Sequence, residues 1–268
     1  MNAINFLNLI RESPKTVLTI KEAAKIIQKP LPYTRLYLYR LKSKGYLQEI
    51  EPGKYTLSAD ELEMAAEMVS PSYISFLSAY AVYGFTTQIV VQTQIVTLKP
   101  KHPIKNKISN FKFITFPQKR FFGYNKQRFR EKYIYIAEKE KAIVDSLYLP
   151  DYCPIDESAR ALQDKSLDIK KIIRYALRMD SIVALKRVGY LLELQGIDIY
   201  PKIKSKLNQR YDLLNPFLSR SKLNSKKWKL NINEVLDYAA KVWAEKIRAI
   251  MTRNKPRDVF DLYFLFKK

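Results

Sequence analysis

The first 57 residues present three short helical segments followed by two short strands, and this order limits the fold more than any other feature of the chain. Apolar side chains recur at helical spacing over residues 3–12, and Ser13-Pro14 ends that segment. Thr19 is followed three residues later by Glu22, which predicts an N-cap and a capping box at the start of a second helix. A proline at position 30 ends that helix.

The third segment has a basic and aromatic composition and is predicted to be helical from about Pro32 to Lys44, with Gly45 suited to its C-terminal cap. Strands are expected at 46–50 and 54–57, joined by a turn with the sequence Glu-Pro-Gly. Three short helices followed by a β-hairpin is the order of a winged helix-turn-helix. In that arrangement the third helix can enter the major groove of DNA and the hairpin can reach the flanking backbone.

Side chains on the third helix have the chemistry that DNA recognition needs, because Arg reads guanine edges and Lys, Tyr and Thr can hold phosphates. Residues 14–54 contain nine Lys or Arg against three Glu. One alternative is a small helical domain whose solvated face is basic, and another is a module that docks only with proteins. The residues predicted to face base edges are Tyr33, Thr34, Arg35 and Tyr39, and those predicted to contact phosphates are Lys42, Lys44 and Lys54.

Residues 68–98 form a 31-residue stretch without a charged side chain, which we interpret as buried core. A spanning helix needs roughly 20 predominantly apolar residues, whereas this stretch is broken by Pro71, Gly84 and several Ser and Gln. A helix is expected over 71–83 and a strand over 88–98. The N-terminus lacks a basic segment before its apolar patch, so no signal peptide is expected and the protein is predicted to be cytoplasmic, without membrane contact.

Residues 99–132 are the most basic block, with eleven Lys or Arg and one Glu, so a net charge of 11 − 1 = +10 out of +22 for the chain. Residues 1–70 hold ten basic and eight acidic residues, a net charge of only +2. Phenylalanines interleave with the cations, and strands are expected at 111–116 and 133–137. This pattern is typical either of aromatic rings that stack on the bases of single-stranded nucleic acid, or of an ordinary sheet whose lysine side chains face solvent. Candidates for additional nucleic-acid contacts are Lys119, Arg120, Lys126, Arg128 and Arg130.

The remaining sequence predicts helices and an irregular basic stretch, which together give a mainly α, α+β protein. We divide it into a winged helix at 1–60, a central α+β domain at 61–215 and a helical tail at 216–268. The helices are expected at 138–148, 154–163, 168–179 and 181–195, the irregular stretch at 201–233, and two further helices after it.

Few residues in this chain suit enzyme chemistry. Cys153 is the only cysteine and cannot form an intrachain disulfide, and His102 is the only histidine, so a Cys/His zinc site is not expected. His102 is expected at the surface, and Cys153 is expected to be structural. Neither a phosphate-binding loop nor a dinucleotide fingerprint is present among the six glycines. We therefore expect no cofactor, no metal and no catalytic residues.

The chain resembles the AbiE-type antitoxins, the DNA-binding half of an abortive-infection toxin-antitoxin system. Five segments carry the resemblance, in the order of that family: RLKSKGYLQEIEPGKYTLS, SPSYISFLSAYAVYGFTTQIVVQTQIVT, IAEKEKAIVDSLYLP, LKRVGYLLELQG and KWKLNIN. The resemblance implies a winged helix that binds inverted repeats upstream of its own operon and represses it. It also implies a second domain, here about residues 70–215, with antitoxin activity. The expected partners are double-stranded DNA, a cognate toxin and a second copy of the chain.

The segment EKIRAIMTRNKPRDVFDL, residues 245–262, resembles instead the C-terminal part of the partner toxin, a nucleotidyltransferase-like protein. That chemistry also needs a Gly-Ser loop and a carboxylate pair, and the chain contains neither a Gly-Ser dipeptide nor an Asp-x-Asp. Arg257, Asp258 and Asp261 are therefore interpreted as a structural set. The expected function is a DNA-binding antitoxin and autorepressor. A nucleotidyltransferase-like enzyme, or an RNA-binding or protein-docking module that uses this tail, is left open.

Overall fold

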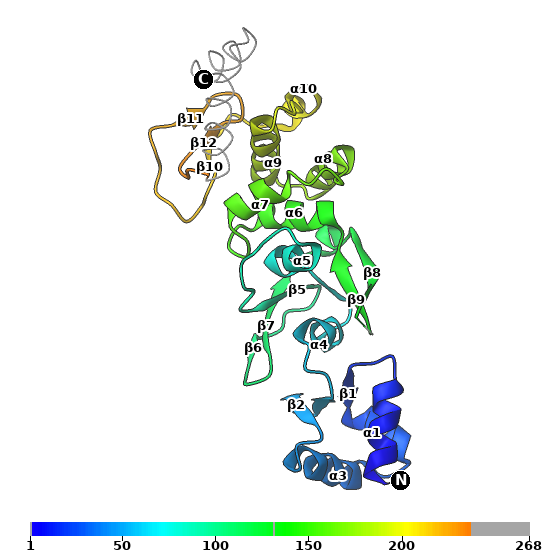
Figure 1. Cartoon of the computed structure of the whole chain (residues 1–268). Coiled ribbons are helices and arrows are strands. Elements are labelled where there is room, and N and C mark those ends of the chain that lie inside the picture. Colours follow the sequence, from blue (N-terminus) through cyan, green and yellow to red (C-terminus); the bar gives the residue numbers. More distant parts are fainter. Residues whose placement is uncertain (1, 131, 237–268) are drawn as a thin grey trace, which may run out of the picture. The chain divides into compact units, whose positions relative to one another are not determined.

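The structure, a computed structural model, describes residues 2–130 and 132–236 (Figure 1). Residue contacts divide the chain into two units, the first made of residues 1–82 and 87–138 and the second of residues 83–86 and 139–268. Helices predominate over strands in the described part of the chain, so the predicted α+β, mainly α fold class is confirmed. The three-domain division made from the sequence stays a prediction.

The first unit begins with a winged helix-turn-helix, as the order of helix and turn signals predicts. Its three strands form an antiparallel sheet in the order β1-β3-β2. The helices close over this sheet through a buried apolar cluster that includes Phe6, Ala23, Leu38 and Tyr55. The elements are α1 (Ala3–Glu12), β1 (Val17–Thr19), α2 (Ile20–Ile27), α3 (Leu31–Ser43), β2 (Gln48–Glu51) and β3 (Lys54–Thr56).

Local signals in the winged helix act as the sequence predicts. Thr19 caps α2, and the reciprocal bonds of a capping box with Glu22 are both present. Gly45 follows the C-cap of α3 with a φ of 76°, a left-handed conformation that glycine adopts without a steric penalty. The strand β1 has no local signal, because it spans three residues and pairs only with the distant β3.

A six-stranded mixed sheet fills the rest of the first unit, in the order β6-β7-β5-β4-β9-β8 (Figure 1). The two middle strands, β5 and β4, pair antiparallel, whereas β5 pairs in parallel with β7 and β4 in parallel with β9. At one edge β8 pairs antiparallel with β9. The elements are α4 (Glu61–Met68), β4 (Ser72–Ile74), α5 (Phe76–Tyr83), β5 (Thr93–Thr97), β6 (Ile104–Lys105), β7 (Asn110–Thr115), the 3-10 turn Gln118–Arg120, β8 (Tyr124–Phe129) and β9 (Lys132–Ala137).

The structure corrects the expected helix over 71–83. Its first residues form β4, which lies between β5 and β9, and the helix α5 begins only at Phe76. The apolar composition suits both structures, and the pairing that decides between them comes from strands far along the chain. Likewise the expected strand over 88–98 is confined to β5, and β8 is a strand that the sequence did not predict.

The second unit is helical, and the four helices expected between 138 and 195 are confirmed. The stretch from 201 to 233, expected to be irregular, contains a short helix and a small three-stranded sheet. The elements are α6 (Lys139–Tyr148), α7 (Ile155–Ala161), α8 (Ile169–Arg178), α9 (Ile182–Leu194), α10 (Tyr200–Ile203), the 3-10 turn Lys204–Lys206, β10 (Asp212–Leu213), β11 (Asn224–Ser225) and β12 (Leu230–Asn231).

Two buried cations on α9 hold the segment that contains β10. Lys186 donates through Nζ to Asn208 Oδ1 and Asp212 Oδ2, both at 2.7 Å. Arg187 donates to the carbonyl oxygen of Leu214 at 2.8 Å, and burial lowers the pKa of its guanidinium to about 10 against the opposing attraction of Asp212. These bonds replace the hydrophobic contacts that a short and polar segment cannot supply.

The helices expected after residue 236, together with Arg257, Asp258 and Asp261, lie outside the described residues. Among the residues that the structure does describe, no helix is long and apolar enough to cross a membrane.

Candidate nucleic-acid interface

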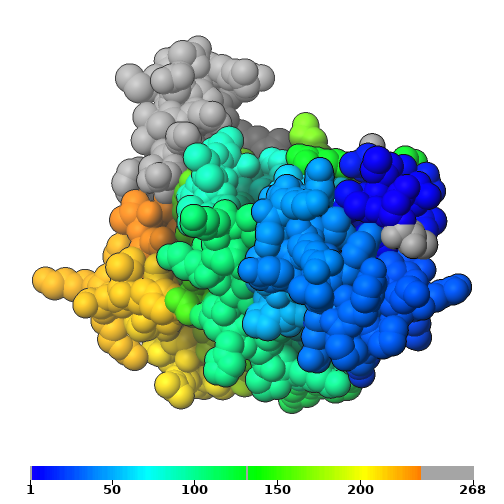
Figure 2. Space-filling model, turned by 90° about the horizontal axis from the view of Figure 1, so that it is seen from below, coloured from blue at the N-terminus to red at the C-terminus, as the bar shows by residue number. Residues whose placement is uncertain are grey.

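The helix α3 lies at the surface of the winged helix. Figure 2 views the molecule from the side on which the winged helix, coloured blue, faces the reader. The inward side of α3 is set by Thr34, Leu38 and Leu41, which are buried and recur at spacings of four and three residues. Pro32 in the first turn adds a fixed φ where no helical N–H bond is needed. The inward side therefore anchors α3 and leaves the rest of the helix exposed.

Arg35, Tyr39 and Lys42 are exposed and share one side of α3, because they are spaced by four and three residues. Tyr39 keeps 61% of its surface exposed. Lys42 forms an ion pair with Glu49 of β2, whereas no ion pair is found for Arg35 within the described ranges. This stripe combines a group that can read guanine with a phenol and a second cation.

Arg40 is a surface residue of α3 that the predicted contacts did not include. It is exposed and lies one turn after Leu36, whose side chain is also exposed. The spacing of Leu38 and Leu41 was the signal that could have found it, because it fixes the inward side of the helix and places Arg40 away from that side. Together with Lys44, which is exposed at the C-cap, Arg40 extends the cationic surface along the helix.

The structure corrects the prediction that Thr34 faces a base edge. Its side chain is fully buried, and Oγ1 donates to the carbonyl oxygen of Pro30 at 3.0 Å. Tyr33 is exposed, and its ring stacks on Tyr37 with 6.3 Å between the centroids. Tyr33 is only two residues from Arg35, so the two side chains do not share a side of the helix.

Lys54, predicted to contact phosphate, is already engaged within the protein. Its Nζ donates to the carbonyl oxygen of Met68 at 2.7 Å and forms an ion pair with Glu51 at 2.9 Å. Lys101 binds the same Glu51 carboxylate, with its Nζ 3.0 and 2.7 Å from the two oxygens. A phosphate would have to compete with these partners for Lys54, so its contact with phosphate stays a prediction.

Hydrogen bonds within the first unit hold two segments in place: the β2–β3 hairpin, which is the wing of this fold, and the strand β1. Asn106 donates through Nδ2 to the carbonyl oxygen of Ile50 at 2.8 Å. The backbone N–H groups of Thr16 and Val17 donate to the carboxylate of Glu67 at 2.8 to 3.0 Å. Burial opposes ionisation of Glu51, but the bonds from Lys101 and Lys54 outweigh it and hold the pKa of this carboxyl below its ordinary value.

The interleaved phenylalanines of the basic block are sheet core, which confirms the plainer of the two interpretations for these rings. The buried members are Phe111, Phe113, Phe116, Phe121 and Phe122. Of the five cations predicted as additional contacts, Lys126 and Arg128 are exposed on β8, Lys119 is exposed and Arg120 is half-buried on the 3-10 turn. Arg130 is exposed but forms an ion pair with Asp60 at 2.6 Å.

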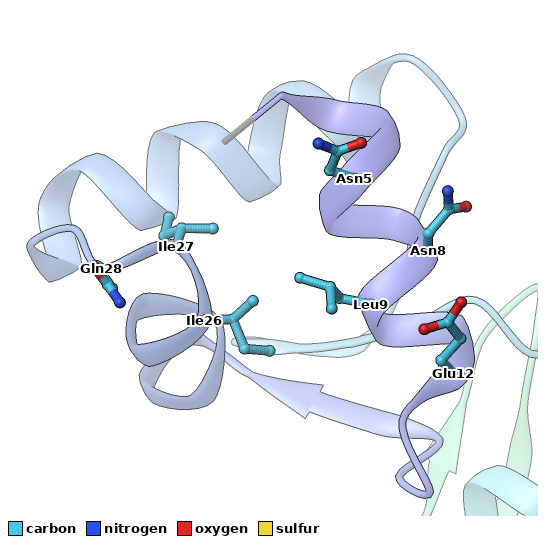
Figure 3. A pocket seen from close by; sticks show the side chains of 7 residues that line it. All are labelled: Asn5, Asn8, Leu9, Glu12, Ile26, Ile27 and Gln28. Carbon is cyan, nitrogen blue, oxygen red and sulfur yellow. The ribbon is translucent and has the colours of Figure 1, made fainter.

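A shallow pocket of about 670 Å³ lies between α1 and α2 in the described part of the chain (Figure 3). Leu9 and Ile26 point toward one another across it, and the carboxylate of Glu12 is on α1 at its edge. Its lining contains no histidine, cysteine or second carboxylate. The lining residues are Asn5, Asn8, Leu9, Glu12, Ile26, Ile27 and Gln28.

The two residues singled out for other chemistry have ordinary positions. His102 is exposed, as expected, and Cys153 is buried. Within residues 2–130 and 132–236, no group of three or more His, Cys, Asp or Glu side chains is placed to hold a metal ion.

No family model matches the chain, and no curated protein matches it. Among solved structures, the chain is similar to the crystal structure of the Rv2827c protein from Mycobacterium tuberculosis, with a TM-score of 0.62 and 13% sequence identity. The likeness covers 90% of this chain and 93% of that one, so the two proteins share a fold over nearly their whole lengths.

Proposed function

We propose that the chain is a sequence-specific binder of double-stranded DNA that acts as an antitoxin and represses its own toxin-antitoxin operon. The observation that carries the DNA-binding part is the outward surface of α3, where Arg35, Tyr39 and Lys42 share one side and Arg40 is exposed on another. This helix belongs to a winged helix-turn-helix, the arrangement that places a third helix in the major groove. The chemistry of these side chains supports contact with both base edges and phosphates.

The antitoxin part of the proposal is supported by the five segments that resemble AbiE-type antitoxins. It makes the chain a cytoplasmic regulator rather than an enzyme, with a cognate toxin and a second copy of itself as partners. Two copies would match the two halves of an inverted repeat. Growth of cells that express the toxin of the neighbouring gene, with and without this chain, tests it: rescue by the chain is expected, and unchanged toxicity would contradict the antitoxin role.

The DNA-binding part is tested with the duplex upstream of the chain's own gene and a scrambled duplex, at one salt concentration. Fluorescence anisotropy should show tighter binding to the upstream duplex, and equal affinity for the two would reject sequence-specific binding. Arg35→Ala should weaken specific binding by about 5- to 150-fold, the equivalent of 1–3 kcal/mol.

Two further variants separate base reading from charge. Arg35→Lys keeps the charge but not the planar fork, so it should lose most of the discrimination between the duplexes. Arg220→Ala removes an exposed arginine of the second unit and should leave that discrimination unchanged. If Arg220→Ala weakens specific binding as much as Arg35→Ala, the role of Arg35 is merely electrostatic.

A further inference from the structure

One face of the β8–β9 hairpin is open to solvent on the side of the hairpin turn, whereas its other end, at Ala137, is buried. Lys126 lies opposite Tyr135 and Arg128 opposite Tyr133 in its antiparallel register. Residues directly opposite each other, and residues two apart on a strand, share a face of the sheet. The opposite face of β9 carries Ile134, which is completely buried. Two tyrosines and two cations are therefore gathered on the other face.

The tyrosine rings on this face are open to solvent. Tyr133 keeps 56% of its surface exposed and Tyr135 keeps 43%. Lys126 Nζ lies 4.7 Å from the centroid of the Tyr133 ring, and Tyr124 meets Tyr135 edge-on with centroids 6.2 Å apart. Large rings gathered on a surface add little to the core, so burial does not account for their presence here.

Flat rings flanked by cations suit a strand of unpaired bases, which stack on the rings while its phosphates meet the cations. Tyr133 and Tyr135 are two residues apart on one strand, so their Cα atoms are about 7 Å apart. This is about twice the 3.4 Å rise per nucleotide within a stacked strand. Two consecutive bases must therefore leave their own stack to reach both rings, which a double helix does not allow without unpairing.

The position of β8 favours RNA over DNA. Within the described residues β8 is the last strand of its sheet, so the backbone groups on its outer side have no strand partner (Figure 1). Such N–H and C=O groups can bind a 2′-hydroxyl, which donates and accepts hydrogen bonds and which DNA lacks. We propose that the β8–β9 hairpin binds single-stranded RNA, with two bases on Tyr133 and Tyr135 and phosphates on Lys126 and Arg128.

The test uses the full chain and a labelled single-stranded RNA of about 12 nucleotides, within the usual size of such sites. Replacing both tyrosines, Tyr133→Ala with Tyr135→Ala, should weaken binding by at least about tenfold, because each lost stack costs severalfold or more. Replacing both by Phe keeps the rings and should preserve binding. Phe217→Ala removes an exposed ring of the second unit and should have no effect.

The proposal is overturned if the Phe pair weakens binding as much as the Ala pair, or if single-stranded DNA of the same sequence binds as tightly as the RNA. It is also overturned if the Ala pair, with a circular dichroism spectrum like that of the wild type, binds RNA unchanged. The result is separate from operator binding, because Arg35→Ala should leave RNA binding intact and the Ala pair should leave discrimination between the two duplexes intact.

Discussion

Removing the buried ammonium of Lys186 should destabilise the second unit by about 3 kcal/mol. The side chain of Lys186 is completely buried, and its Nζ contacts Asn208, the carbonyl oxygen of Arg210 and the carboxylate of Asp212. Lys186→Met keeps most of the apolar chain but leaves Asp212, whose side chain is only 10% exposed, without its main partner.

The size of the expected stability loss depends on which hydrogen-bond partners remain for the oxygen atoms that accept from Lys186. Removing one member of a buried ion pair costs about 3–5 kcal/mol. Asn208 and Arg210 are exposed, so their oxygen atoms can accept hydrogen bonds from water in place of Lys186. Asp212 retains the Arg210 guanidinium as a partner at 3.5 Å. These remaining partners place the expected loss at the lower end of that range. Lys202→Met, at an exposed lysine, is the matched control and should change stability by less than about 0.5 kcal/mol.

Urea unfolding followed by tryptophan fluorescence measures the loss. Trp228 is fully buried in the second unit. All variants would carry Trp243→Phe, so that Trp228 is the only source of tryptophan fluorescence. Adding Asp212→Asn removes the second charge and should restore at least about 1 kcal/mol, since contacting residues couple by 0.5–3 kcal/mol. A loss below about 1 kcal/mol for Lys186→Met, or no recovery in the double variant, would refute the reasoning.

Two further predictions concern packing and pH. Gly189→Ala would place a Cβ 2.1 Å from a ring carbon of the buried Trp228, so it should cost at least about 1–3 kcal/mol of stability; an unchanged urea midpoint would contradict this. Because the pKa of Glu51 is lowered in the folded state from its ordinary 4.5, its contribution to stability is complete above about pH 4.5 and is lost as the pH falls through the folded pKa. The protection factors of the amides in the β2–β3 hairpin, which correct for the intrinsic slowing of exchange in acid, should therefore fall on acidification, and Glu51→Gln should flatten that fall; an equally steep fall in the variant would exclude Glu51 as its source.

The candidate interface is only partly predictable, because the sequence shows which residues α3 contains more readily than which way they face. Arg35, Tyr39 and Lys42 were expected at the surface and are exposed there. Thr34 is predicted to face a base edge, yet it is buried because it lies on the same side of α3 as Leu38. The exposure of the tyrosine rings of β9 could not be predicted, since the alternation over 133–137 does not say which face packs against the protein.

The order of helices and turns in the winged helix was determined by the sequence itself, because its signals act within a few residues. The Thr19–Glu22 capping box and the left-handed Gly45 each need only their own neighbours. The tertiary structure alone decided that Ser72–Ile74 is a strand and that Tyr133 and Tyr135 face solvent. The first outcome depends on β5 and β9, which are far from β4 along the chain, and a pairing between distant strands leaves no mark on the sequence of either one. The second depends on which face of the β8–β9 hairpin the rest of the first unit covers, and alternation along a strand does not say which face that is.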